Sequence, residues 1–141
     1  MENKPVRLTT RAHFSAAHRL LNPAFSEEKN EAMYGRCIRQ HGHNYQLEVT
    51  VRGTPDQNGM AMDLSALEAT INAAVLNLVD HRDLNDVPAL GGVITTGENL
   101  VQSFWRMLSA ALPPGALHRV AVIETAKNRF EYFGDGIPPK E

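Results

Sequence analysis

The sequence has one cysteine and no apolar run that approaches the length of a membrane span. A single cysteine excludes an intramolecular disulfide, so we expect a cytoplasmic protein whose thiol stays reduced. A membrane-spanning helix needs about 20 apolar residues in a row, and the first residues lack the apolar core of a signal peptide. We therefore expect neither a membrane anchor nor a membrane partner.

The sequence also lacks an excess of positive charge. The chain has 14 Lys and Arg residues against 16 Asp and Glu residues, which gives a net charge of −2. No basic run is interleaved with aromatic residues, so we expect no nucleic-acid partner. With 141 residues the chain is long enough to bury a core, and we expect a single domain over residues 1–141 with a tail from about residue 134.

Hydrophobic periodicity predicts four strands and two helices. The expected strands are residues 6–16, 45–52, 117–124 and 130–133. The first expected helix is residues 64–79, capped by Asp63. A capping box of Thr95 and Glu98 is expected to open the second helix, which ends at Pro113. We expect the polar segment 21–36 to be a loop that includes one helical turn.

The order of these elements is strand, strand, helix, helix, strand, strand. This order predicts an α+β fold (ββααββ), with a four-stranded antiparallel sheet and both helices on one face. A sheet of this kind has two open edges, which proteins commonly cover by joining subunits. We therefore expect a homo-oligomer.

Two histidines and the single cysteine lie within seven residues, from Cys37 to His43. If residues 40–53 are extended, His41 and His43 project from the same face of a strand. His18, at the end of the preceding strand, is a candidate third imidazole. Three neutral imidazoles with an open fourth position are typical of a catalytic Zn²⁺ site, although Fe²⁺ and Ni²⁺ also suit such ligands. The alternative is a polar surface without a metal.

Three further positions carry groups suited to acid–base chemistry. Cys37 is a candidate fourth metal ligand, a thiolate base, or a buried structural cysteine. The pair Asp80 and His81 follows a helix end, where a carboxylate orients an imidazole for proton transfer or the two residues simply cap the helix. Glu124 ends an apolar strand, so its carboxylate needs a donor-rich partner or a salt bridge.

Taken together, these residues resemble the 6-pyruvoyl-tetrahydropterin synthase family, which includes the bacterial 6-carboxy-tetrahydropterin synthases of queuosine biosynthesis. The resemblance runs from Phe14 to about Tyr132. Its motifs are Phe-Ser-Ala-Ala-His-Arg-Leu, Cys-x-x-x-His-Gly-His-Asn-Tyr, Gly-Met-Ala-Met-Asp-Leu, Leu-Val-Asp-His-Arg-Asp-Leu-Asn, Thr-Gly-Glu-Asn-Leu and Val-Ile-Glu-Thr.

The resemblance implies a tunnelling fold (T-fold), in which the sheets of three subunits close into a barrel and two trimers stack into a homohexamer. Barrel closure would cover the open sheet edges. The resemblance also implies active sites at the subunit interfaces and a zinc ion on three imidazoles. The implied zinc ligands are His18, His41 and His43.

The implied activity is that of a lyase acting on 7,8-dihydroneopterin triphosphate, with loss of triphosphate. In this family Cys37 would remove the proton, and Asp80 with His81 would form a second acid–base pair from a neighbouring subunit. The implied pterin-binding residues are Glu124, Thr96 and Glu98. The candidates for holding the triphosphate are Arg19, Lys29, Arg36, Arg39, Lys127 and Arg129.

Two branches of the family differ in product. The three residues between Cys37 and His41 resemble the carboxy-forming enzymes, whereas residues 26–30 and 34–37 resemble the pyruvoyl-forming ones. Gly97 departs from the hydroxyl-bearing residue that usually follows Thr96. We expect the 6-carboxy-5,6,7,8-tetrahydropterin synthase activity of the queuosine pathway. The alternatives are a 6-pyruvoyl-tetrahydropterin synthase of the tetrahydrobiopterin pathway, an aldolase-like cleavage of dihydroneopterin, and a non-catalytic zinc- or pterin-binding module.

Overall fold

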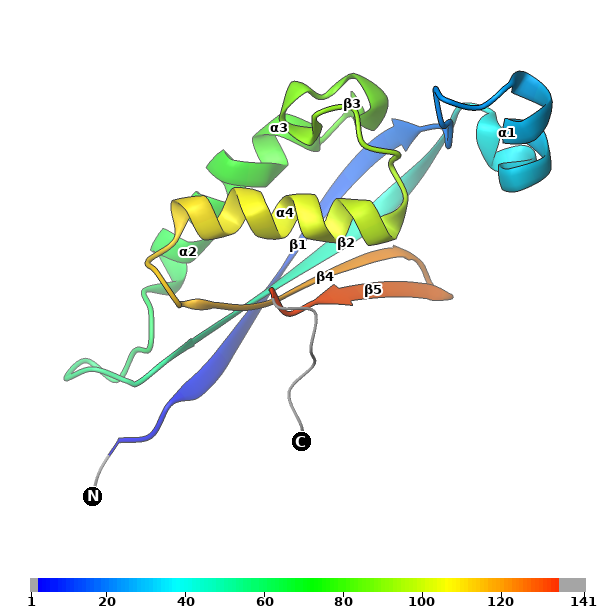
Figure 1. Cartoon of the computed structure of the whole chain (residues 1–141). Helices are drawn as coiled ribbons and strands as arrows, with labels where there is room; N and C mark the ends of the chain where they lie inside the picture. Colours follow the sequence, from blue (N-terminus) through cyan, green and yellow to red (C-terminus); the bar gives the residue numbers. More distant parts are fainter. Residues whose placement is uncertain (1–2, 135–141) are drawn as a thin grey trace.

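A computed structural model describes residues 3–134 and shows an α+β fold, as expected, with the main helices on one face of a sheet (Figure 1). The sheet has five strands in the order β3-β1-β2-β4-β5. The strands are β1 (Val6–His18), β2 (His41–Gly53), β3 (Arg82–Asp83), β4 (Leu117–Thr125) and β5 (Asn128–Tyr132). The tail expected beyond residue 134 lies outside the described residues. No helix among residues 3–134 combines the length and apolar character needed to cross a membrane.

The expectation of four antiparallel strands is wrong, because β3 adds a fifth strand that runs parallel to β1. Only two residue pairs join them, Ala16 with Arg82 and Ala17 with Asp83. A two-residue strand is too short to produce an alternating pattern in the sequence. It forms where the chain leaving the helical layer returns to the outer edge of β1.

Strands β1 and β2 are both longer than expected and pair antiparallel over their whole length of 13 residues. The ladder runs from Val6 opposite Gly53 to His18 opposite His41. The sequence understates β2 because residues 41–44 are polar or glycine. The histidine motifs are therefore part of the β1–β2 ladder and form its last residue pairs.

The core lies between the sheet and the helical layer. Phe14 of β1 stacks on Tyr45 of β2, with ring centroids 4.7 Å apart, and Phe104 of α4 (Gly97–Ala111) meets Phe14 edge-on at 5.8 Å. The other fully buried side chains include Leu47, Val49, Leu67, Ile71, Leu84, Leu90, Leu100 and Leu108. Burial of these side chains fixes which face of β1 and β2 points toward the helices. On this face lie the even-numbered residues at the end of β1 and the odd-numbered residues at the start of β2, so the histidine motifs project accordingly.

The helix expected over residues 64–79 is present but has a break in its regularity. It consists of α2 (Leu64–Ile71), a π-helical turn (Asn72–Leu76) and α3 (Asn77–Val79). Asp63 caps it as expected, since its side chain accepts a hydrogen bond from the backbone of Ser65. The remaining short elements are 3-10 helices at Gly35–Ile38, Leu84–Asp86 and Pro88–Leu90.

The capping box expected at α4 is wrong by one residue. Thr96, rather than Thr95, is the N-cap, and its hydroxyl accepts a hydrogen bond from the backbone of Asn99. Thr95 is fully buried, and its hydroxyl lies 3.1 Å from Nδ1 of His18 instead. The hydroxyl of Thr95 therefore takes part in a long-range contact rather than in the cap of the helix.

Segment 21–36, expected to be a loop, contains the eight-residue helix α1 (Glu27–Tyr34). Ser26 caps the helix, and the carboxylates of Glu27 and Glu28 lie in its first turn. Negative charge at this end of a helix interacts favourably with the helix dipole. The helix has no apolar face, so hydrophobic periodicity could not reveal it. Its buried anchor is the amide of Asn30, which accepts from the backbone of Asn22 and donates back to it.

The sheet face opposite the helices carries a charged network around Glu48. Glu48 is 4% exposed, and its carboxylate accepts hydrogen bonds from Arg11, Arg119 and Arg129 at 2.7–2.9 Å. Burial alone would raise the pKa of Glu48, but these hydrogen bonds outweigh it and lower the pKa to about 2. The network ties β1, β2, β4 and β5 together.

Candidate metal centre and active site

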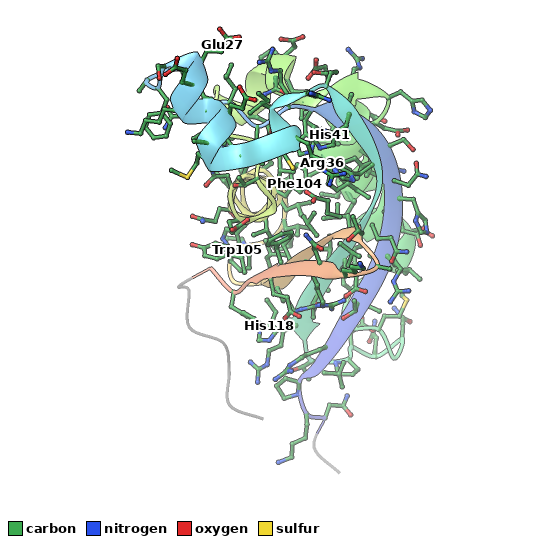
Figure 2. The ribbon with its side chains drawn as sticks, turned by 90° about the vertical axis from the view of Figure 1, so that its right-hand side faces the viewer. Glu27, Arg36, His41, Phe104, Trp105 and His118 are labelled. Carbon is green, nitrogen blue, oxygen red and sulfur yellow. The ribbon has the colours of Figure 1, made fainter. Side chains whose placement is uncertain are left out.

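Three imidazoles meet at one end of the β1–β2 ladder. His18 ends β1 opposite His41, and His43 lies two residues farther along β2 on the same face. One ligand nitrogen from each ring lies within 4.8 Å of the others. Figure 2 shows the labelled His41 at the end of the sheet near helix α1. The spacing in the sequence therefore brings these three side chains together in space.

Hydrogen bonds orient two of the imidazoles. Nδ1 of His18 lies 2.9 Å from the carbonyl oxygen of Thr95, and Nδ1 of His41 lies 2.7 Å from the carbonyl oxygen of Arg39. A carbonyl oxygen can only accept, so both Nδ1 atoms carry the proton. The two Nε2 atoms then carry no proton, so their lone pairs can bind a metal, as is usual for imidazole ligands held by an outer hydrogen bond. Nε2 of His18 also lies 3.4 Å from the hydroxyl of Tyr45.

The cluster also favours the neutral imidazole that metal binding requires. Burial, together with the neighbouring His41, lowers the pKa of His18 to about 4. Burial likewise lowers the pKa of His43. Nε2 of His43 is buried without a hydrogen-bond partner in the described part of the chain. An orphaned buried nitrogen beside two unprotonated imidazole nitrogens fits a bound transition metal.

Cys37 does not belong to this cluster. Among the described residues, the side chains close enough to share a metal ion are the three imidazoles alone. Cys37 is half-buried in the 3-10 helix Gly35–Ile38, and its carbonyl oxygen accepts a hydrogen bond from Leu20, two residues after His18. The geometry therefore disfavours Cys37 as a fourth ligand and leaves its thiol available for other chemistry.

Glu124 lies beside the cluster. It extends from β4, and Oε1 of its carboxylate is 3.9 Å from Nε2 of His43. The other two candidate pterin-binding residues lie at the start of α4. Thr96 is its N-cap, and the side chain of Glu98 in the first turn is exposed.

Tyr45 is a site residue that the sequence analysis missed. Its hydroxyl is 3.4 Å from Nε2 of His18, and its side chain is fully buried. Burial and the nearby Glu124 raise the pKa of this hydroxyl, so it remains a hydrogen-bond donor. The alternation along β2 could have revealed it, because Tyr45 shares a face with His41 and His43.

Asp80 and His81 form a pair at the outer edge of β1. Oδ1 of Asp80 accepts from the backbone N–H of Ser15 at 2.9 Å and lies 2.9 Å from Nδ1 of His81. The hydrogen bond from Ser15 is the main cause of the lowered pKa of Asp80. His81 adopts a left-handed backbone conformation (φ 58°), and its N–H donates to the carbonyl of Ser15 at 2.6 Å.

The imidazole of His81 is 81% exposed. It borders a hollow of about 500 Å³ that Ser15 and Asn44 also line. These two side chains are hydrogen bonded to each other at 2.7 Å, and they alternate with the residues of β1 and β2 that face the helices. The pair of Asp80 and His81 is therefore assembled within one chain. The exposed imidazole of His81 remains accessible to contact from outside this chain.

A family model described as 6-pyruvoyl tetrahydropterin synthase matches residues 7–135. The chain belongs to this family. The match covers the span over which the sequence motifs indicated the same relationship, and it makes the chain a member of a family of lyases.

Similarity to individual members of the 6-pyruvoyl tetrahydropterin synthase family extends over most of the chain. The chain is 40% identical over 135 residues to a 6-pyruvoyl tetrahydrobiopterin synthase of Dictyostelium discoideum, covering 94% of this chain and 99% of the relative. It is 38% identical over 133 residues to the protein of that name from Homo sapiens, covering 92% of each.

A carboxy-forming relative matches over a shorter span. The 6-carboxy-5,6,7,8-tetrahydropterin synthase of Synechocystis is 36% identical over 110 residues, covering 74% of this chain and 83% of the relative. The solved structure of Caenorhabditis elegans 6-pyruvoyl tetrahydropterin synthase superimposes with a TM-score of 0.89 at 35% identity, covering 95% of this chain and 99% of that one. These comparisons favour the pyruvoyl-forming branch over the expected carboxy-forming one.

Proposed function

We propose that this protein is a 6-pyruvoyl tetrahydropterin synthase, which converts 7,8-dihydroneopterin triphosphate to the 6-pyruvoyl product with release of triphosphate. The observation that carries the proposal is the similarity to proteins of that name over nearly the whole chain. The expectation of a 6-carboxy product rested on the three residues between Cys37 and His41. Whole-chain similarity outweighs a single loop length. We further propose that residues 1–141 form one domain.

We propose Zn²⁺ as the metal, held by His18, His41 and His43. The donor set supports this choice, because nitrogen-only ligation suits Zn²⁺ better than Mg²⁺ or Ca²⁺. When bound, the ion would supply Lewis acidity to the oxygens of the substrate side chain. The orphaned Nε2 of His43 is the feature of the chain that most directly supports a ligand at this position.

Glu124 would hold the pterin. A carboxylate can accept two hydrogen bonds from an amino-pyrimidine edge, and these bonds are strengthened by its charge. Its position 3.9 Å from His43 would place the pterin ring next to the metal centre. The neutral hydroxyl of Tyr45 would remain a donor beneath the same site.

Cys37 would take the proton from the substrate side chain, and His81 would exchange protons through Nε2, since its Nδ1 faces Asp80. The imidazole of His81 is exposed at the outer edge of β1, which suits a role in the active site of a neighbouring subunit. The open edges of the sheet support the T-fold assembly, a trimeric barrel or a hexamer made of two such barrels.

Product analysis by mass spectrometry tests this proposal. The zinc-loaded protein is incubated with 7,8-dihydroneopterin triphosphate, and we expect a 6-pyruvoyl product and free triphosphate. A 6-carboxy product with released acetaldehyde would instead assign the protein to queuosine synthesis. Turnover of dihydroneopterin lacking the triphosphate would indicate an aldolase-like enzyme.

A Cys37→Ala variant provides the matched control. We expect it to bind zinc and pterin normally and to lose turnover, because the thiol lies outside the metal cluster. A wild-type protein that binds both ligands but shows no turnover would support a binding module.

A further inference from the structure

The 3-10 helix Leu84–Asp86, which follows β3, holds the chain next to His18 through the side chain of Asn85. Oδ1 of Asn85 accepts a hydrogen bond from the backbone N–H of Arg19 at 2.8 Å, and Nδ2 of Asn85 donates to the carbonyl oxygen of Arg19 at 3.0 Å. A single side-chain amide therefore satisfies both backbone groups of the residue after His18. This arrangement replaces the strand partner that Arg19 lacks, since β1 ends at His18.

Asp83, the last residue of β3, contacts the residue before His41. Oδ2 of Asp83 accepts a hydrogen bond from Nε2 of Gln40 at 3.0 Å. Oδ1 of Asp83 accepts from the backbone N–H of Asn85 at 3.0 Å, which holds Asn85 in place. The two side chains thus reach the neighbours of two imidazoles from one short segment.

These hydrogen bonds of Asn85 and Asp83 lie where the sheet alone provides little restraint on the backbone. His18 and His41 form the last pair of the β1–β2 ladder, and β3 supports β1 only as far as Ala17. Terminal pairs open more readily than pairs inside a ladder. A metal site tolerates little spreading, because Zn–N distances are close to 2.0–2.1 Å. Beyond the ladder, the backbone after His18 is held by the hydrogen bond from Leu20 to the carbonyl oxygen of Cys37 and by the two hydrogen bonds of Asn85 to Arg19.

We propose that Asn85, itself held by Asp83, is a positioning residue for the metal centre. It fixes the backbone of Arg19, and through it the separation of His18 from His41. This inference rests on the metal centre of the proposed function, and it concerns metal binding rather than the chemistry on the pterin.

Two substitutions separate the two hydrogen bonds. Asn85→Ala removes both, whereas Asn85→Asp keeps the acceptor for Arg19 N–H and loses the donor to its carbonyl. Asn77→Ala, at an exposed position on α3, is the matched control. Zinc affinity of the full chain is measured by chelator competition, and the ligand geometry is measured from the visible spectrum of the Co²⁺-loaded protein.

We expect Asn85→Ala to weaken zinc binding by about tenfold or more, in line with the loss of outer-shell partners at other metal sites, and to alter the Co²⁺ bands. Asn85→Asp should fall between this variant and wild type, and Asn77→Ala should match wild type. A merely structural role would lower the free energy of unfolding of the metal-free protein and leave the Co²⁺ spectrum of the folded protein unchanged.

Zinc affinity within twofold of wild type in both Asn85 variants, with unchanged Co²⁺ bands, would overturn the inference. A wild-type protein that binds neither metal would overturn it together with the proposed metal centre. Metal binding that depends on Asn85 in a protein without turnover would uphold the inference and count only against the proposed function.

Discussion

The ring of Phe130 occupies the space that a side chain at position 97 would need. Gly97 is buried in the first turn of α4, and a Cβ atom built on it would overlap the ring carbons of Phe130 on β5. The departure of Gly97 from a hydroxyl-bearing residue therefore has a packing cause. The absence of a side chain at position 97 leaves room for the aromatic ring of Phe130.

We predict that Gly97→Ala destabilises the protein by about 1–3 kcal/mol, because the added methyl group displaces Phe130. In a Phe130→Ala background the same change should cost less or even stabilise, since alanine is favoured over glycine in helices. Urea unfolding of the four proteins in the double-mutant cycle measures the difference. Equal costs in both backgrounds would contradict the packing explanation.

The charged network predicts acid sensitivity. The pKa of Glu48 is about 2, below its ordinary value of 4.5, so the network stabilises the folded state above pH 4.5 and loses this contribution as the pH falls toward 2. At about 1.4 kcal/mol per pKa unit, the contribution at neutral pH is on the order of 3 kcal/mol. Glu48→Gln should therefore lower the free energy of unfolding at pH 7, and the difference from wild type should shrink on acidification.

Denaturant titrations between pH 7 and pH 3 test this, with Glu68→Gln on the exposed side of α2 as the control. A Glu48→Gln protein as stable as wild type at pH 7 would show that the arginines lose nothing when the buried charge is removed.

His118 predicts a second pH effect, at a higher pH. Burial is the main cause of its lowered pKa, and the neighbouring Arg7, Arg52 and Arg119 lower it further. In the unfolded chain the imidazole of His118 takes up a proton near pH 6.5, whereas in the folded chain it takes up this proton only at lower pH. The free energy of unfolding therefore falls as the pH drops below about 6.5. His118→Gln should reduce this fall. Unfolding free energies at pH 7.5 and 5.5 provide the measurement, and an unchanged difference between the two pH values would count against it.

The left-handed backbone of His81 predicts an inverted order of stability for two variants. Neither His81→Gly nor His81→Ala has an imidazole, but only alanine is strained at φ 58°. We expect the glycine variant to be more stable by about 1 kcal/mol. At Asn77, which has helical geometry, the order should reverse in favour of alanine. Thermal or urea unfolding measures both pairs, and the same order at both positions would rule out backbone strain.

Sequence patterns predicted the parts of the fold that repeat along the chain. Alternation located β1 and most of β2, an apolar run located β4, and helical spacing located α2 and α4, because each buries apolar side chains. Strand β3 and helix α1 bury almost no apolar surface. They form through hydrogen bonds to distant or polar partners, which leave no periodic trace.

The candidate site divides in the same way. The spacing of His41 and His43 within one strand was sufficient to predict that they point together. The contact of Asn85 with Arg19 spans 66 residues and depends on where the 3-10 helix after β3 lies, which no local pattern encodes. Tyr45 lies between these cases, since its face was predictable but its distance from His18 was not.

The position of the three imidazoles at the end of a 13-residue ladder has a consequence for native-state hydrogen exchange. Amides near the middle of β1 and β2 should exchange only through global opening, whereas those beside His18 and His41 should also exchange through local fraying. A bound ion would close the frayed end. Zinc should therefore slow amide exchange selectively over the last few pairs of the ladder. The difference in exchange rate between the middle and the end of the same strand would then report whether the metal is bound.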